Sequence, residues 1–83
     1  MPTVLIIGPY RIGFYSKENQ EPPHVHVKRD RCNAKFWLEP VKLARYRGFG
    51  DRELNIIREL VEANRQTCLE EWHAHFRHKS GDR

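Results

Sequence analysis

The spacing of apolar residues changes at Asp51, and this change sets the fold class. Before it, His24-Val25-His26-Val27-Lys28 alternates polar and apolar side chains, which is typical of a strand with one buried face. After it, apolar residues recur at steps of three and four from Leu54 to Phe76, which is typical of an amphipathic helix. A sheet followed by a helix predicts an α+β fold.

Four strands are predicted before residue 41, at 3–7, 10–16, 24–28 and 34–39. We expect a mainly antiparallel sheet, covered on one face by a long C-terminal helix. The predicted organisation is one domain over residues 1–83, with the sheet in 1–40, a connecting loop in 41–50 and the helix in 51–79. Within the loop, residues 41–46 form either a short helical turn or a brief extended segment.

The predicted helix is long for a chain of 83 residues. About 25 helical residues span roughly 38 Å, which exceeds the width of a domain of this size. We therefore expect its last turns, from Trp72 to His78, to overhang, to bend or to pack on another chain.

Alternation assigns the strand side chains to two faces. The face covered by the helix is predicted to hold Ile12, Phe14, Val25, Val27, Phe36 and Leu38. By elimination, the open face is predicted to hold Arg11, Tyr15, His24, His26, Lys28, Lys35, Trp37 and Glu39.

The charge of the chain favours an anionic partner, because 15 Lys and Arg stand against 11 Asp and Glu, for a net charge of +4. Arg11, Lys28 and Lys35 are the candidates for binding phosphate. Trp37, like Tyr15, offers a ring on which an unpaired base can stack. The open face is therefore a candidate nucleic-acid-binding surface.

A catalytic role is the second interpretation of this face. His24, His26 and Tyr15 are the candidate catalytic residues, because metal-independent RNA cleavage needs groups that accept and donate a proton. A ribonuclease is the only enzymatic interpretation considered, and the sequence does not decide whether the chain is an enzyme. A third interpretation is a plain scaffold, because polar side chains are normal on any half-exposed sheet.

Several other classes of site find no support in the sequence. There is no Cys-x-x-Cys, and His73, His75 and His78 cannot converge from one helix, so no metal and no cofactor is predicted. No apolar run approaches the length of a membrane span. Cys32 and Cys68 are far apart, so we expect free thiols and a cytoplasmic protein.

Trp72 and Phe76, near the end of the helix, have two interpretations. They either cap the core, as a helical apolar stripe usually does, or form an exposed patch that binds a partner chain. The length of the helix favours the partner-binding interpretation, and a homodimer is one form that it could take.

Two segments resemble a known family. Glu21-Pro22-Pro23-His24-Val25-His26-Val27 and Lys35-Phe36-Trp37-Leu38 are similar to the bacterial family called domain of unknown function 4160. The resemblance extends to about Trp72. Gly50 is a departure, because it stands where a helix-capping serine is expected.

The resemblance implies a role rather than an activity. Members are similar to small proteins of two-gene cassettes, so it implies a toxin–antitoxin-like or mobile-element module. The expected partners are a cognate protein encoded nearby and RNA or DNA. The alternatives are a metal-independent endoribonuclease toxin and an inhibitor that binds only protein.

Overall fold

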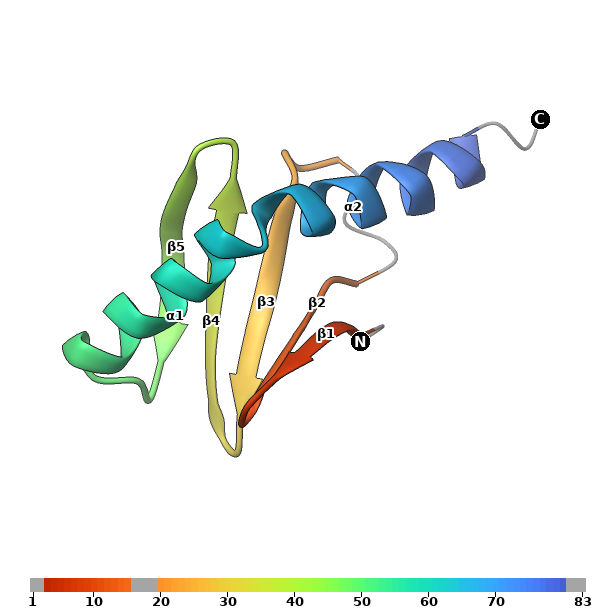
Figure 1. The fold of residues 1–83 in the computed structure, drawn as a ribbon. Coiled ribbons are helices and arrows are strands. Elements are labelled where there is room, and N and C mark those ends of the chain that lie inside the picture. The colour runs from red at the N-terminus through yellow and green to blue at the C-terminus, as the bar shows by residue number, and fades with distance from the viewer. Residues whose placement is uncertain (1–2, 16–19, 81–83) are drawn as a thin grey trace.

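The chain folds into a five-stranded sheet followed by two helices (Figure 1). The computed structural model describes residues 3–15 and 20–80, with side chains described as far as Phe76. The elements are β1 (Thr3–Ile7), β2 (Tyr10–Gly13), β3 (His24–Arg29), β4 (Cys32–Leu38), β5 (Val41–Arg47), α1 (Asp51–Ala63) and α2 (Arg65–Ser80). The α+β class is confirmed, but the prediction of four strands and one helix was wrong by one element of each kind.

The sheet is a meander in which each strand pairs with the next one in the sequence. Its order is β1-β2-β3-β4-β5, and every neighbouring pair is antiparallel. Tight turns join the strands at Gly8 and Asp30, whose φ values of 56° and 55° lie in the left-handed region. Glycine and aspartate tolerate that region better than most residues, so the sequence itself permits these turns.

The strand β5 corrects the assignment of residues 41–50 to a connecting loop and confirms the extended alternative for residues 41–46. Lys35 pairs with Arg45, whereas Phe36 pairs with Leu43, so Ala44 is an extra residue that forms a bulge. An extra residue shifts the alternation of polar and apolar side chains by one position. The segment therefore lacks a continuous period of two, although it pairs with β4 along its whole length.

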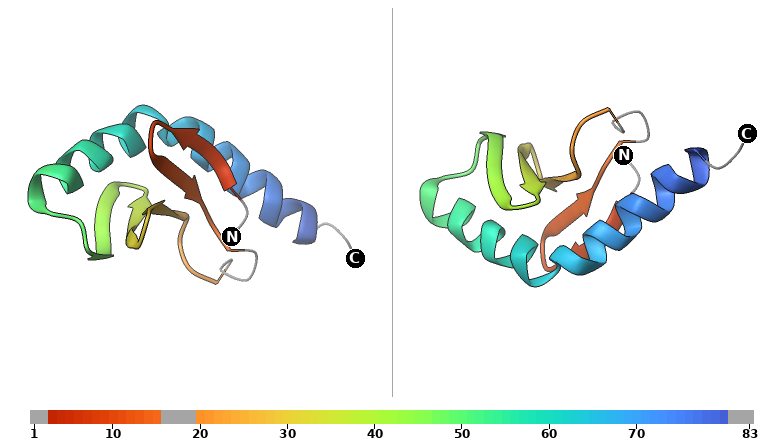
Figure 2. Two further views of the ribbon diagram at one scale, coloured as in Figure 1. Left: turned by 90° about the horizontal axis from the view of Figure 1, so that it is seen from below. Right: turned by 90° about the horizontal axis from the view of Figure 1, so that it is seen from above.

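The predicted single helix is interrupted at Asn64. The Asn64 backbone has a φ of −110° and a ψ of 15°, outside the helical region, and the carbonyl of Leu60 accepts hydrogen bonds from both the Asn64 backbone, over 3.1 Å, and the Asn64 side chain, over 2.8 Å. Arg65 then begins α2, and its Nε donates to the carbonyl of Leu38 at the end of β4 over 2.6 Å. The bend and this anchor make the helices follow the sheet as an arc (Figure 2).

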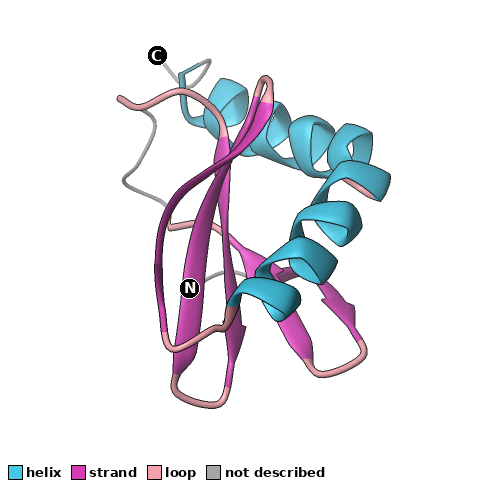
Figure 3. Cartoon of the chain, turned by 90° about the vertical axis from the view of Figure 1, so that its left-hand side faces the viewer, coloured by secondary structure: helices cyan, strands magenta, loops and turns pink. Residues whose placement is uncertain are grey.

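The helices cover one face of the sheet (Figure 3). Ile12, Val25, Val27, Phe36 and Leu38 are buried there, as predicted, against Leu54, Ile57, Val61 and Cys68. The fold extends over 44 × 23 × 21 Å, because the end of α2 projects beyond the sheet (Figure 1). The helical part therefore both bends and overhangs.

Neither helix, over the residues that the structure describes, is long and apolar enough to cross a bilayer.

Candidate nucleic-acid interface

The pairing register brings the predicted site residues of three strands to one face. The cross-strand pairs are Arg11–Lys28, His26–Lys35 and His24–Trp37. Directly paired residues point to the same side of a sheet, and here that side is the one opposite the helices. The prediction that these six side chains share a face is confirmed.

The strand β5 adds three cations that sequence reasoning did not assign to this face. Lys42 pairs with Trp37, Arg45 with Lys35 and Arg47 with Asn33, so all three point to the same face and all three are exposed. Their alternate spacing was the only signal in the sequence, and it becomes visible once the bulge at Ala44 is known. We call the surface formed by Arg11, Lys28, Lys42, Arg45 and Arg47 the basic face.

Positive charge predominates in the strands, whereas acidic and basic residues are mixed in the helices. No Asp or Glu lies in any of the five described strands, whereas seven Lys and Arg do: Arg11, Lys28, Arg29, Lys35, Lys42, Arg45 and Arg47. By contrast, α1 carries Asp51, Glu53, Glu59 and Glu62. The basic face is therefore not neutralised by acids of its own strands.

The two histidines of β3 share this side of the sheet but are not exposed on it. His24 is 0% exposed and His26 is 8% exposed, so the expectation that both imidazoles face water was wrong. The His24 ring lies 5.6 Å from Trp37 and 4.9 Å from Trp72, and Tyr15 covers His26 at 4.9 Å. Alternation predicts the side of the sheet to which each histidine points. It does not predict that Trp72 of α2 and Tyr15 cover the two rings.

Burial limits the chemistry of the imidazoles. The Nδ1 atom of His24 lies 2.9 Å from the carbonyl oxygen of Pro22, inside the chain itself. A catalytic base or acid must come within hydrogen-bond reach of its substrate, and a fully buried ring does not reach a ligand on the surface. Tyr15, at 37% exposed, is the most accessible of the three candidate catalytic residues.

Lys35 is also buried, at 6% exposed, and it is held by a residue that sequence reasoning missed. Its ammonium lies 2.5 Å from Glu21 Oε1 and 4.6 Å from the centre of the Trp37 ring. The same Glu21 oxygen is 3.7 Å from Nδ1 of His24. Lys35 was predicted to bind phosphate from an exposed position, but in this structure its charge is compensated by Glu21.

Trp72 and Phe76 belong to the interior of the chain. Both pack on Phe14, with ring centres 5.2 Å and 5.7 Å from it, and 4.3 Å from each other. Both are buried, so the core-capping interpretation is confirmed and an exposed patch for a partner is wrong. Phe14 lies just beyond the end of β2 and supplies the surface that these helical rings need.

An ion-pair network fixes α1 to the other end of the sheet. Arg29 donates to both carboxylate oxygens of Glu53, over 2.7 Å and 2.8 Å, and the Tyr10 hydroxyl donates to Glu53 over 2.6 Å. These bonds, that of Arg29 first, lower the pKa of Glu53. The hydrogen bond to Glu53 raises the pKa of Arg29 and, together with burial, that of Tyr10. The network holds Arg29 at the edge of a hollow.

This hollow, of about 280 Å³, is lined by Pro9, Arg11, Lys28, Arg29 and Asp30. Arg29 also donates to Asp30 over 3.0 Å. Among the described residues, no acid forms an ion pair with Arg11 or Lys28. Two cations whose charge is not compensated by a described residue therefore meet here, in a concave part of the basic face.

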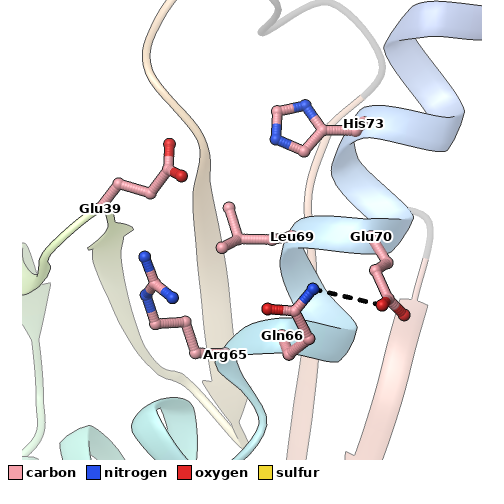
Figure 4. Close-up of a pocket in the computed structure, with 6 residues that line it drawn as sticks. All are labelled: Glu39, Arg65, Gln66, Leu69, Glu70 and His73. Atoms are coloured by element: carbon pink, nitrogen blue, oxygen red, sulfur yellow. Dashed lines mark hydrogen bonds between the residues drawn. The ribbon is translucent and has the colours of Figure 1, made fainter.

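A second hollow, of about 430 Å³, lies between the β4–β5 turn and α2 (Figure 4). Its lining is mixed in charge: Glu39, Arg65, Gln66, Leu69, Glu70 and His73. Glu39 was predicted on the open face, but it lies in the turn after β4 and lines this hollow beside α2. No group of three or more metal-ligating side chains occurs among the described residues.

Comparisons with known proteins place the chain in a family. One family model matches residues 10–73, a segment that runs from β2 into α2 and contains every residue of the basic face. No curated protein and no solved structure matches the chain. The family match confirms the resemblance inferred from the sequence. The chain belongs to the family described as domain of unknown function (DUF4160).

Proposed function

We propose that this protein binds nucleic acid through the basic face, as one component of a two-protein module of the toxin–antitoxin or mobile-element kind. The single observation that carries the nucleic-acid part is the collection of Arg11, Lys28, Lys42, Arg45 and Arg47 on one face of strands that contain no acid. Lysine and arginine bind phosphates by displacing counterions, whatever the base sequence. The partner-protein part rests on the family resemblance alone.

The nuclease alternative has less support. It needs imidazoles that reach a ribose or phosphate, and His24 and His26 are buried. The protein-only alternative has no contact among the described residues that favours it, and the exposed patch expected around Trp72 and Phe76 is absent because both residues are buried. Nucleic-acid binding without cleavage therefore agrees best with the exposure of these side chains.

Binding of labelled oligonucleotides to the full chain, followed by fluorescence anisotropy between about 50 and 200 mM salt, tests the proposal. The informative variant is Arg45→Ala/Arg47→Ala, which removes two exposed cations from β5. We expect weaker binding and a shallower dependence of log K on log salt, by about 1.4 to 1.8 if both residues contact phosphate.

The matched control is Arg52→Ala/Arg58→Ala, which removes the same charge from α1 in the opposite layer. This control should bind almost as the unaltered protein does. Equal losses in both double variants would show that net charge, and not the basic face, governs binding. Absence of binding at about 50 mM salt, for RNA and DNA alike, would reject the nucleic-acid part.

The partner-protein part needs its own experiment. Co-expression with the protein encoded beside this one, followed by purification through a tag on one of them, should yield a stable complex. Recovery of the tagged protein alone, under conditions where both are soluble, would reject the two-protein module without affecting the nucleic-acid result.

A further inference from the structure

We infer that the hollow between the β1–β2 turn and the end of β3 is a phosphate seat for single-stranded nucleic acid, with Tyr15 stacking on the adjacent base. The inference rests on the proposed function and deepens it, because it names the kind of strand and the residues that hold it. The proposed site combines a concave, positively charged hollow with the aromatic ring of Tyr15, which lies beside Lys28 on the same face.

The cationic part of the site is formed by Arg11 and Lys28, which are cross-strand partners. Both line the hollow, and no described acid pairs with either. Arg29 lines it too, but Glu53 holds that guanidinium from two sides and offsets its charge. Arg29 therefore shapes the hollow, while Arg11 and Lys28 supply the charge that a phosphate needs.

The aromatic part of the site is Tyr15. The Lys28 ammonium lies 5.7 Å from the centre of the Tyr15 ring, so one residue contacts both the hollow and the ring. Tyr15 remains 37% exposed. Base stacking on such a ring requires a base that is not already stacked in a duplex, which favours single strands.

Between the hollow and the ring, the β2 residue on this face is Gly13, which has no side chain and is itself buried. Gly13 follows Arg11 on the same face and pairs with His26, beside which the Tyr15 ring packs. Two residues of a strand span about 6.8 Å, which is comparable with the separation of a base from its own phosphate. A nucleotide can therefore place its phosphate at Arg11 and Lys28 and its base toward Tyr15.

Asp30 is the one acid among the described residues that line the hollow, and it provides a gain-of-function test. Its backbone has a φ of 55°, a conformation that asparagine also accepts, so Asp30→Asn should leave the turn intact while removing a negative charge beside the phosphate. We expect this variant to bind single strands more tightly than the unaltered protein.

The experiment measures affinity for a single-stranded RNA, a single-stranded DNA and a DNA duplex of matched length. Tyr15→Ala should lower affinity for single strands by about 5- to 100-fold, and Tyr15→Phe should retain it, because stacking needs the ring and not the hydroxyl. Arg11→Ala and Lys28→Ala should weaken binding and reduce its salt dependence. The two single-stranded probes distinguish RNA from DNA as the ligand.

Three results would overturn the inference. Duplex binding as tight as single-strand binding, unchanged affinity in Tyr15→Ala, or unchanged affinity in Asp30→Asn would each reject the seat while leaving the basic face as a general nucleic-acid surface. If no probe binds at all, the proposed function fails together with the inference. Thermal melting of each variant verifies that it is folded before its affinity is interpreted.

Discussion

The carboxylate of Glu21 lies 2.5 Å from the ammonium of Lys35, on the side of the sheet that carries the basic face. Lys35 is buried beneath Trp37, whereas the Glu21 side chain is 46% exposed. The contact therefore places the negative charge of Glu21 beside the positive charge of Lys35 on this side of the sheet. Glu21 therefore both stabilises the buried lysine and lowers the positive potential next to the basic face.

Glu21→Gln should separate these two effects. Loss of the charge should strengthen nucleic-acid binding, because the potential beside the basic face becomes more positive. The same change should lower the free energy of unfolding by about 1 kcal/mol, because Lys35 loses its charged partner. Anisotropy measures the first effect and urea titration the second. Glu70→Gln on α2 is the control with the same charge change, and an equal gain in affinity in that variant would refute a local role for Glu21.

The aromatic cluster of Phe14, Trp72 and Phe76 should be essential for stability. Trp72→Ala should lower the free energy of unfolding by about 3–5 kcal/mol, because it leaves a large cavity against Phe14 and His24. Ile56→Ala, on an α1 residue that is 48% exposed, should cost far less. Urea titration followed by circular dichroism compares the two variants. Native stability in Trp72→Ala would show that Trp72 is not a core residue.

Gly48 should tolerate substitution much less well than Gly50. Its φ is 91°, and an added Cβ would lie 2.8 Å from Sγ and 3.3 Å from Cα of Cys32. Gly48→Ala should therefore lower the free energy of unfolding by at least about 1–2 kcal/mol. Gly50 has a φ of −85° and no heavy atom within 4 Å of such a Cβ, so Gly50→Ala carries no steric cost and should lower stability only by about 0.5–1 kcal/mol, because alanine is a poorer capping residue. Thermal melts of the two variants should differ clearly in midpoint, and similar midpoints would contradict the assigned backbone conformation.

Glu53 should make stability depend on acid pH. Hydrogen bonds from Arg29, and then from Tyr10, hold its pKa below the usual glutamate value in the folded chain. A lowered folded pKa gives stability that is present above the unfolded pKa, near about 4.3, and lost as the pH falls through the folded pKa. Urea titrations between about pH 6 and pH 3 should show a smaller decline in Glu53→Gln than in the unaltered chain. Parallel declines would mean that other carboxyl groups cause the acid sensitivity.

Glu53 makes tertiary contacts at the start of α1, where a capping interaction is expected. A glutamate at this position of a helix can hydrogen-bond back to the capping residue when that residue is serine. Here the capping residue is Gly50, which makes no side-chain hydrogen bond, and the Glu53 carboxylate is bound to Arg29 and Tyr10. The position where the family resemblance leads us to expect serine is thus occupied by glycine, and Glu53 binds residues of the sheet instead of the capping residue. A search for local capping signals in the sequence does not detect such long-range contacts.

The strands that could be predicted from the sequence are those in which polar and apolar side chains alternate regularly. In β3, the valines and the histidines point to opposite sides of the sheet, as the alternation predicts, and the valines lie in the core against the helices. For β5, the sequence does not decide between a helical turn and an extended segment, because the bulge at Ala44 breaks its period. The break at Asn64 was missed because the apolar spacing continues across it, from Val61 to Cys68.

The burial of the site residues could not be predicted in the same way. Alternation assigns His24 to a face, but its exposure depends on Trp72, which is 48 positions later in the sequence, and on the ring of Trp37 beside it. Lys35 is covered through Glu21, which precedes β3. Such contacts depend on how separate elements close on one another, and no local period encodes them.

The meander order of the sheet has a consequence for how the chain reaches its native state. Every strand pairs with its immediate neighbour in the sequence, so each step of sheet assembly closes only a short loop. Topologies built from such local pairings fold faster than those in which distant segments must meet first. We expect rapid hairpin-by-hairpin assembly, with the docking of α2 on Phe14 as the last event and as the step most sensitive to changes in the aromatic rings.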